Sequence, residues 1–186
     1  MAAGVARKYR TFWPRFWAGL IDGLVLLPLA WVDSAVWANI DATPLLVLWF
    51  VFYSLVGVAY TIVLHGLYGQ TIGKRLTGVR VLNVSEARLS MRQALLRDTV
   101  LLVLLGWALV IDLPTVFSGK NPYAEGATIT TAHWISLYAM LAWFALELIT
   151  MLTNDKRRAV HDFIAKSVVV RVAYATETPD EEALRA

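Results

Sequence analysis

The most informative pattern in this chain is the alternation of long apolar stretches with short polar segments. The four apolar stretches cover residues 16–37, 44–66, 98–117 and 131–153. Each is close to the length of about 20 residues that an α-helix needs to cross the hydrocarbon core of a bilayer. The pattern therefore predicts an all-α membrane protein, built as a bundle of four transmembrane helices.

The polar segments predict a small β-pair beside this bundle. Residues 79–84 and 167–172 are short runs rich in β-branched side chains, as is typical of strands. Because a lone strand leaves its backbone N–H and C=O groups unpaired, we expect the two runs to pair with each other. Ser90 and Gln93 have the spacing of a helix capping box. The third helix should therefore begin outside the membrane, near Met91.

Three further polar segments are expected to lie outside the bundle. Residues 69–78 are rich in glycine and are interpreted as a tight turn at the membrane surface. Residues 154–166 are expected to form a short basic helix on that surface. Residues 173–186 are acidic and polar, which predicts a disordered tail. Residues 1–172 then form one transmembrane domain.

The basic residues predict how the chain is oriented. They lie before the first apolar stretch, between the second and third, and after the fourth, whereas the other two gaps hold only Lys120. Short basic loops remain on the cytoplasmic side of a membrane. We therefore expect both termini, the loop at 67–97 and the β-pair to be cytoplasmic, in a protein of the inner (cytoplasmic) membrane.

Composition excludes several other classes of protein. Hydrophobic residues make up 58% of the chain and charged residues only 17%, whereas an ordinary soluble domain is about a quarter charged. Membrane topology accounts for the net charge of +3, so no nucleic-acid partner is expected. The absence of cysteine excludes disulfides and thiolate metal sites. The sequence has no nucleophile motif, so no enzyme activity is expected, and no cofactor is expected. His65 and His133 fall at opposite membrane faces, so they cannot complete a metal site with His161. The first helix carries Asp22 and is too long for a cleaved signal peptide.

Carboxylates inside the apolar stretches are the candidate chemistry. Asp22, Asp98 and Glu147 interrupt three different stretches, and such residues are costly in a bilayer unless they serve a polar site. Counted from the basic side, Asp22 and Glu147 lie about 10 Å deep at about 1.5 Å per residue, and Asp98 lies at the mouth. We expect the three to line one inward-facing cavity. Carboxylates close together split their pKa values, which suits exchange of a proton for Na⁺ or K⁺.

Two arginines are the expected counter-charges. Arg15 could reach Glu147 or Asp98, and Arg97 could meet Asp22. A purely structural reading stays open beside the functional one, because buried ion pairs can simply fix the order and orientation of helices.

Other charged residues have expected roles at the membrane surface. Lys74, Arg75 and Arg80 are interpreted as contacts to lipid headgroups or as a gate at the mouth of the cavity. His161 and Asp162 are interpreted as a structural hydrogen-bond clamp.

Four separated blocks of the sequence resemble the RDD family of bacterial membrane proteins. The blocks are residues 15–22, 69–81, 92–97 and 156–165. The family is named for one arginine and two aspartates. Arg15 and Asp22 match the first two, and the second aspartate is matched by Asp162 or, as the alternative, by Asp98. The resemblance implies a membrane protein with a role in transport, since some members look like monovalent cation/proton antiporters. It implies no catalytic activity.

Together these observations predict a small ion or solute transporter that uses its intramembrane carboxylates. Its possible partners are monovalent cations, protons and anionic lipids of the bilayer. The alternative is a non-transporting membrane scaffold or accessory subunit that binds lipid or a partner protein. Four helices make a thin wall for a transport path, and Gly19 and Gly23 have the spacing that favours close helix packing. A homo-oligomer is therefore expected.

Overall fold

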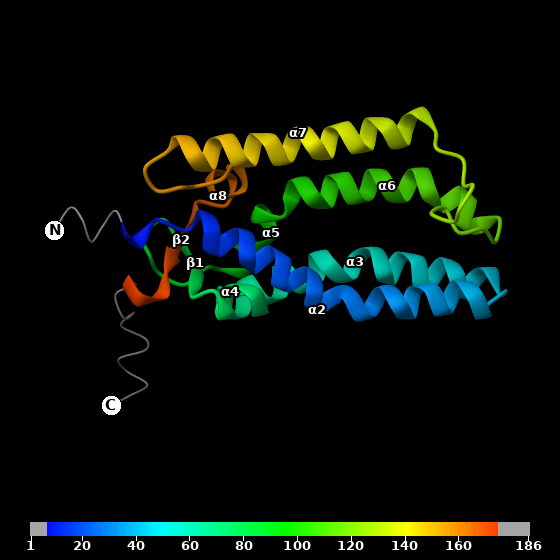
Figure 1. Ribbon diagram of the computed structural model, residues 1–186, viewed down its shortest axis with the longest axis horizontal. Helices are drawn as coiled ribbons and strands as arrows, with labels where there is room; N and C mark the ends of the chain where they lie inside the picture. The colour runs from blue at the N-terminus through cyan, green and yellow to red at the C-terminus, as the bar shows by residue number, and fades with distance from the viewer. Residues whose placement is uncertain (1–6, 175–186) are drawn as a thin grey trace.

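The apolar stretches form four long helices, each long and apolar enough to cross a membrane. The computed structural model describes residues 7–174 (Figure 1). The long helices are α2 (Phe12–Asn39), α3 (Thr43–Tyr68), α6 (Thr99–Phe117) and α7 (Thr131–Thr153). The shorter elements are α4 (Ile72–Leu76), β1 (Val79–Asn83), α5 (Met91–Arg97), α8 (Val160–Ile164), β2 (Ser167–Arg171) and the 3₁₀ turn η1 (Val172–Tyr174).

The long helices bury very little of their surface against one another. Within the most apolar stretch of each, the share of buried residues runs from 0% in α2 to 17% in α3. A helix that is apolar on all sides and barely buried by its own chain is stable only in an apolar solvent. The chain is therefore a multi-pass membrane protein, and the predicted bundle of four helices is confirmed.

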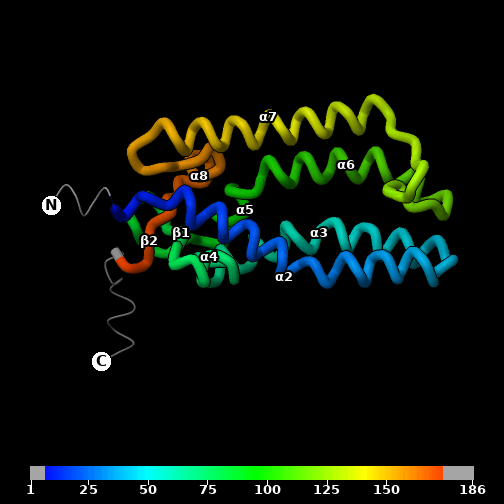
Figure 2. The backbone as a smooth tube through the Cα atoms, in the orientation of Figure 1, coloured from blue at the N-terminus to red at the C-terminus, as the bar shows by residue number. Residues whose placement is uncertain are grey.

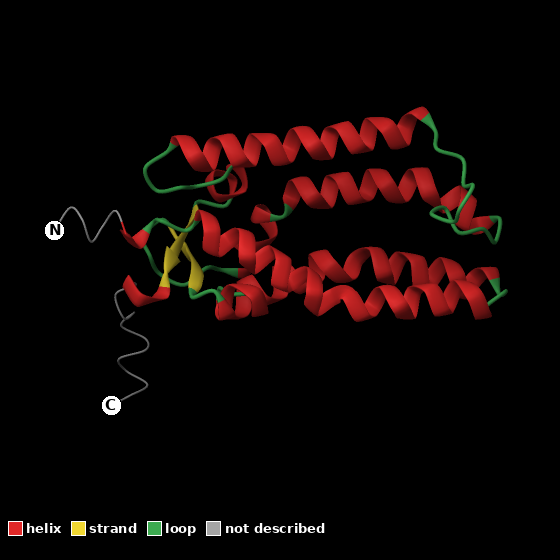
Figure 3. Ribbon diagram, viewed as in Figure 1, coloured by secondary structure: helices red, strands yellow, loops and turns green. Residues whose placement is uncertain are grey.

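The short elements gather at one end of the bundle. At this end α2 begins, α3 ends, α6 begins and α7 ends, and α4, α5, α8 and the sheet lie there together (Figures 1 and 3). We call this the basic end, and the end with the turns at 40–42 and 118–130 the opposite end. The described chain both starts and finishes at the basic end (Figure 2).

The two strands form the predicted β-pair. β1 and β2 are antiparallel, with Val79 opposite Arg171 and Asn83 opposite Ser167. One buried cluster joins valines of both strands to α3 and α5: its members are Ile62, Val79, Val81, Leu89, Ala94 and Val169. Tyr9, in the segment before α2, packs against a second group of side chains from the two strands, among them Leu82 and Val170. The sheet therefore connects the segment before α2, the end of α3 and the C-terminal segment.

A glycine allows the chain to leave α3 and enter this compact end. Gly69 follows α3 with a φ of 69°, and its N–H donates to the His65 carbonyl at 2.9 Å. A Cβ at this position would lie 2.7 Å from the Val81 carbonyl oxygen. Only glycine fits both the left-handed backbone and the close approach of β1.

Three predictions need correction. The segment at 69–78 contains helix α4 instead of a simple turn, because Thr71 caps that helix by accepting a hydrogen bond from the Lys74 N–H. The helix expected over 154–166 is only α8, because Asn154 side-chain hydrogen bonds hold the preceding residues in a loop. The third helix does begin at Met91 with the predicted capping box, but it breaks at Asp98 into α5 and α6. The tail prediction falls on residues outside the described ones, apart from 173–174 in η1.

Candidate functional site

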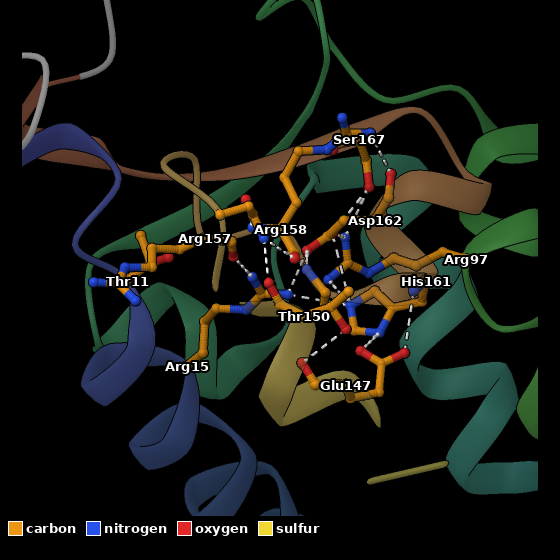
Figure 4. A network of polar contacts seen from close by, with 12 residues as sticks. Thr11, Arg15, Arg97, Glu147, Thr150, Arg157, Arg158, His161, Asp162 and Ser167 are labelled. Carbon is orange, nitrogen blue, oxygen red and sulfur yellow. Dashed lines mark hydrogen bonds and ion pairs between the residues drawn. The ribbon is translucent and has the colours of Figure 1, made fainter. Parts of the chain in front are cut away.

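A buried aspartate lies between two arginines at the basic end. Asp162, on α8, is 0% exposed. Arg15 Nη2, from the first turns of α2, lies 2.7 Å from Asp162 Oδ2, and Arg97 Nη1, at the end of α5, pairs with Oδ1 (Figure 4). Burial by itself raises the pKa of this carboxyl, but the charges of Arg15 and Arg97 outweigh it and hold the pKa well below its usual range. Asp162 is therefore ionised.

Two neutral donors complete the shell around Asp162. The Ala159 N–H donates to Oδ2 and the Ser167 hydroxyl donates to Oδ1, each at 3.0 Å. Arg158 also donates to the backbone carbonyls of Asp162 and Ser167, both at 2.9 Å. The buried carboxylate thus has a donor for every lone pair that it presents, which is what a charge in a dry site requires.

The neighbouring histidine carries this cluster on to α7. His161 Nε2 lies 3.1 Å from Arg15 Nη2 and 2.7 Å from Arg97 Nη2. Guanidinium nitrogens can only donate, so Nε2 must be the unprotonated nitrogen and Nδ1 carries the proton. The His161 backbone N–H donates to Glu147 Oε1 at 3.1 Å, and Nδ1 lies 2.7 Å from Glu147 Oε2. Burial and the charge of Arg97 lower the pKa of His161, in keeping with a neutral ring.

We call these five residues the arginine–aspartate cluster: Arg15, Arg97, Glu147, His161 and Asp162. They come from α2, α5, α7 and α8, so one polar network holds together elements from both halves of the chain (Figure 4). The predicted pairings differ from those observed. Arg15 pairs with Asp162 instead of Glu147 or Asp98, and Arg97 also pairs with Asp162 instead of Asp22.

Asp22 attaches α4 to α2. Its carboxylate accepts hydrogen bonds from the Tyr60 hydroxyl at 2.7 Å, the Thr71 hydroxyl at 2.6 Å and the Gly73 N–H at 2.7 Å. A Cβ on Gly73 would lie 2.9 Å from Asp22 Cγ and would overlap the Ala18 carbonyl. The close contact between α4 and α2 therefore requires glycine at position 73.

A second polar group at the basic end is less completely hydrogen-bonded. We call it the Lys74 cluster: Thr61, His65, Lys74 and Asp98. Asp98, at the junction of α5 and α6, accepts one side-chain hydrogen bond, from the Thr61 hydroxyl at 3.2 Å. His65 is 3% exposed, and neither of its ring nitrogens has a hydrogen-bond partner within residues 7–174. Lys74 makes no ion pair with any described carboxylate.

Lys74 and Asp98 have shifted proton affinities. Burial, together with the charges of Arg97 and Arg15, lowers the pKa of Lys74 to about 7, against the opposing pull of Asp22 and Asp98. Burial raises the pKa of Asp98, against the charge of Arg97. A lowered pKa on an amine and a raised pKa on a neighbouring carboxyl are the shifts expected of groups that take up and release protons.

The opposite end has its own polar contact. Asp112 accepts hydrogen bonds from the Tyr123 hydroxyl at 2.7 Å and from His133 Nε2 at 2.9 Å. His133 Nδ1 in turn accepts from the Thr130 N–H at 3.1 Å, which places the ring proton on Nε2. Burial and the hydrogen bond to Asp112 raise the pKa of Tyr123. These contacts attach the 118–130 turn to α6 and α7.

The remaining predicted residues occupy separate places. Arg75 is exposed on α4, and Arg80 lies on β1 and is half-buried. Lys74 differs from them, because it lies close enough to Asp22, Asp98 and Arg97 for their charges to shift its pKa. No group of three His, Asp or Glu side chains comes together as metal ligands in the part of the chain that the structure describes.

Sequence reasoning missed several members of these sites. Tyr60, Thr61 and His65 are polar side chains within the apolar run of α3. Thr61 and His65 are also four residues apart, so they share one helix face. That spacing was a usable signal. Thr71 and Gly73 gave none, because their role depends on the fold of α4 against α2.

The fold and the polar network at one end define a multi-pass helical membrane protein with a charged, protein-buried cluster at the membrane boundary. Comparison with known families gives the same class: the model of the RDD family matches residues 9–166. The match covers most of the chain, and the protein belongs to the RDD family. No curated protein and no solved structure matches the chain.

Replacing Asp162 by Asn should destabilise the protein strongly. The change leaves two buried arginines without a counter-charge, and breaking a buried pair in this way costs about 3–5 kcal/mol. Unfolding of the purified protein in detergent, followed by circular dichroism, measures the effect. Asp155→Asn is the matched control, because Asp155 is exposed in the loop before α8. Equal stability of the two variants would contradict the role given to Asp162.

The shifted pKa of Lys74 predicts a pH dependence of stability. In the unfolded chain a lysine has a pKa of about 10.4, whereas Lys74 in the fold has a pKa of about 7. Between these values the unfolded state binds the proton more tightly, so stability is highest above the upper value and falls as the pH drops toward 7. Melting temperatures across this window should therefore rise with pH. Lys74→Met should reduce the slope of melting temperature against pH. Lys120→Met, at an exposed lysine, should leave that slope unchanged. Equal slopes in the wild-type protein and both variants would contradict the lowered pKa of Lys74.

Proposed function

We propose that this protein is a small ion or solute transporter of the inner membrane that exchanges a proton for a monovalent cation at the Lys74 cluster. The observation that carries the proposal is a buried polar group whose hydrogen-bonding capacity is not used. His65 has two unpartnered ring nitrogens, and Asp98 accepts from Thr61 alone among the described side chains. Unused polar capacity in a buried place is what a ligand site needs before its ligand arrives.

The chemistry of exchange follows from Lys74 and Asp98. A cation bound at the Asp98 carboxylate is close enough to Lys74 for like charges to repel, which favours loss of the Lys74 proton. Because the pKa of Lys74 is already about 7, only a small further shift releases that proton. Na⁺ or K⁺ would be bound by three groups: the carboxylate of Asp98, the hydroxyl of Thr61 and a ring nitrogen of His65. One cation then replaces one proton, and the net charge of the site does not change.

The proposal assigns the site differently from the prediction based on Asp22 and Glu147. Asp22 already accepts three hydrogen bonds. Glu147 accepts one at Oε1 from the His161 backbone N–H, and its Oε2 lies 2.7 Å from His161 Nδ1. A cation at either carboxylate would have to displace contacts that hold α4 or α8 in place. An ion-binding role for these two residues stays a prediction, which the same assay tests through an Asp22→Asn, Glu147→Gln double variant.

Orientation and assembly belong to the same proposal. The basic loops support a cytoplasmic location for the basic end and both termini, which would open the Lys74 cluster toward the cytoplasm. The four spans are barely buried by their own chain. A homo-oligomer would supply the further walls that a path across the membrane needs.

One observation favours a second candidate, a non-transporting scaffold or accessory subunit. The contacts of Asp162 with Arg15 and Arg97 and those of Asp22 hold elements together at the basic end. A scaffold needs such rigid contacts and needs no ion path. It predicts that Asp22→Asn lowers bundle stability or oligomer yield while no ion moves in any variant.

Proteoliposomes with a pH-sensitive dye inside test the transporter. Addition of Na⁺, K⁺ or Li⁺ to the wild-type protein should move protons across the membrane. Asp98→Asn and Lys74→Met should each slow this flux by about tenfold or more, since losing one charged contact worth about 1.4 kcal/mol has that effect. Asp41→Asn, at an exposed site of the opposite end, should leave it unchanged.

Two results would contradict the proposal. Absence of proton movement with every cation would favour the scaffold. Full flux in Asp98→Asn together with loss of flux in the Asp22→Asn, Glu147→Gln variant, provided that this variant still folds, would return the site to the carboxylates first predicted.

A further inference from the structure

A cavity away from the Lys74 cluster brings three arginines together. It has a volume of about 470 Å³ and lies between the start of α2, the loop after α7 and the end of β2. Arg10, Arg157 and Arg171 line it, together with Trp13 and Leu152. We call it the three-arginine cavity. No carboxylate is among the described residues that line it, so within residues 7–174 three positive charges meet in the cavity wall without a counter-charge there.

The position of the cavity matches the headgroup level of a membrane. Trp13 lies in the first turn of α2 and Leu152 in the last turn of α7, where these spans leave the hydrocarbon. Both side chains are open to the surroundings, Trp13 at 62% and Leu152 at 47% exposure. Tryptophan is enriched at this boundary because its ring has both an apolar body and a polar N–H. The cavity therefore has an apolar side that faces lipid and a basic side that faces the short elements.

The fold holds two of the arginines in place. Arg171 Nε donates to the Arg10 carbonyl at 2.9 Å, and Arg157 Nη1 donates to the Leu152 carbonyl at 2.6 Å. Arg157 also has a φ of 50°, a left-handed backbone that is uncommon for a residue with a side chain. Its carbonyl accepts a hydrogen bond from Arg15 Nη1 at 3.0 Å, which ties that backbone to the arginine–aspartate cluster.

Most of the N–H donors of these arginines are not used by residues 7–174. A guanidinium has five N–H donors, and Arg157 and Arg171 each use one in the contacts above. The Arg10 side chain donates to no residue of the described chain. Arginine binds phosphate with two parallel hydrogen bonds, an arrangement that a single lysine cannot reproduce. Three such groups around one space define a site for a phosphate.

We propose that the three-arginine cavity binds the phosphate group of an anionic glycerophospholipid. The phosphate lies among Arg10, Arg157 and Arg171, and the acyl chains run along Trp13 and Leu152 into the hydrocarbon beside α2 and α7. The lipid fixes the start of α2 to the end of α7, the two spans at the ends of the chain. The site is separate from Lys74, Arg75 and Arg80, and it does not depend on whether the protein transports an ion.

Lipid retention by the purified full-length protein tests this proposal. Native mass spectrometry in detergent, with phosphatidylglycerol or phosphatidylcholine added at equal concentration, measures the fraction of protein that carries each lipid. Phosphatidylglycerol should be retained in preference. Arg10→Gln should weaken its binding about fivefold, the effect of removing about 1 kcal/mol of attraction for one basic residue at the membrane surface. Arg92→Gln is the matched control, since Arg92 is exposed at the same end and lies outside the cavity.

Arg10→Gln is the informative variant, because the Arg10 side chain makes no hydrogen bond that holds another element of the described chain in place. A second arm adds inorganic phosphate and measures the melting temperature, which separates a free phosphate from a lipid headgroup. Stabilisation by phosphatidylglycerol but not by inorganic phosphate supports the lipid. Equal stabilisation by both, equal retention of the two lipids, or equal losses in Arg10→Gln and Arg92→Gln would overturn the proposal.

Discussion

The structure depends on one buried carboxylate held between two guanidinium groups. Asp162 is inaccessible to solvent, and it is ionised because Arg15 and Arg97 surround it. Removing these charges from water is costly, and the cost is offset only when every charge has a partner and every lone pair has a donor. The three residues therefore have to come together, and in doing so they fix α2, α5 and α8 relative to one another. His161 and Glu147 extend the same network to α7.

This arrangement reverses the usual division between core and surface. The four spans turn apolar side chains outward and bury little between them, because lipid is as good a solvent for leucine as a protein interior. One buried cluster near the opposite end packs α3 against α6, with Leu46 and Phe50 in contact with Val116. Polar contacts at the two ends add to this packing: the arginine–aspartate cluster, the attachment of α4 through Asp22, and the contact of Asp112 with Tyr123 and His133. The charge asymmetry of the sequence is thus more than a topology signal, since several of those basic residues are structural partners.

Local patterns made much of the fold predictable. The four spans follow from long apolar runs, the β-pair from two β-branched runs, and the start of α5 from Ser90 and Gln93. Each depends on residues close together in sequence, where spacing and geometry are linked. Helix α4 was not predicted in this way, because a helix of five residues is too short to show a periodic pattern.

The partners of the charged residues could not be predicted in the same way. Arg15 and Asp162 are 147 positions apart, and a carboxylate accepts hydrogen bonds from any donor that reaches it. Asp22 illustrates the difficulty: the sequence pointed to an arginine, whereas a tyrosine, a threonine and a backbone N–H surround it. The sequence correctly located the charged residues at one end of the bundle. Choosing among partners there required the positions of α4, α5 and α8.

The most direct test of this account is the coupling free energy between Arg97 and Asp162. Unfolding free energies in detergent would be measured for the wild-type protein, Arg97→Gln, Asp162→Asn and the double variant. If the buried ion pair organises the basic end, the double variant should be more stable than the sum of the single losses predicts, by about 2 kcal/mol or more, because the second change removes a charge that the first left unpaired. Additive losses would contradict the account, since they would mean that the two residues stabilise the protein independently.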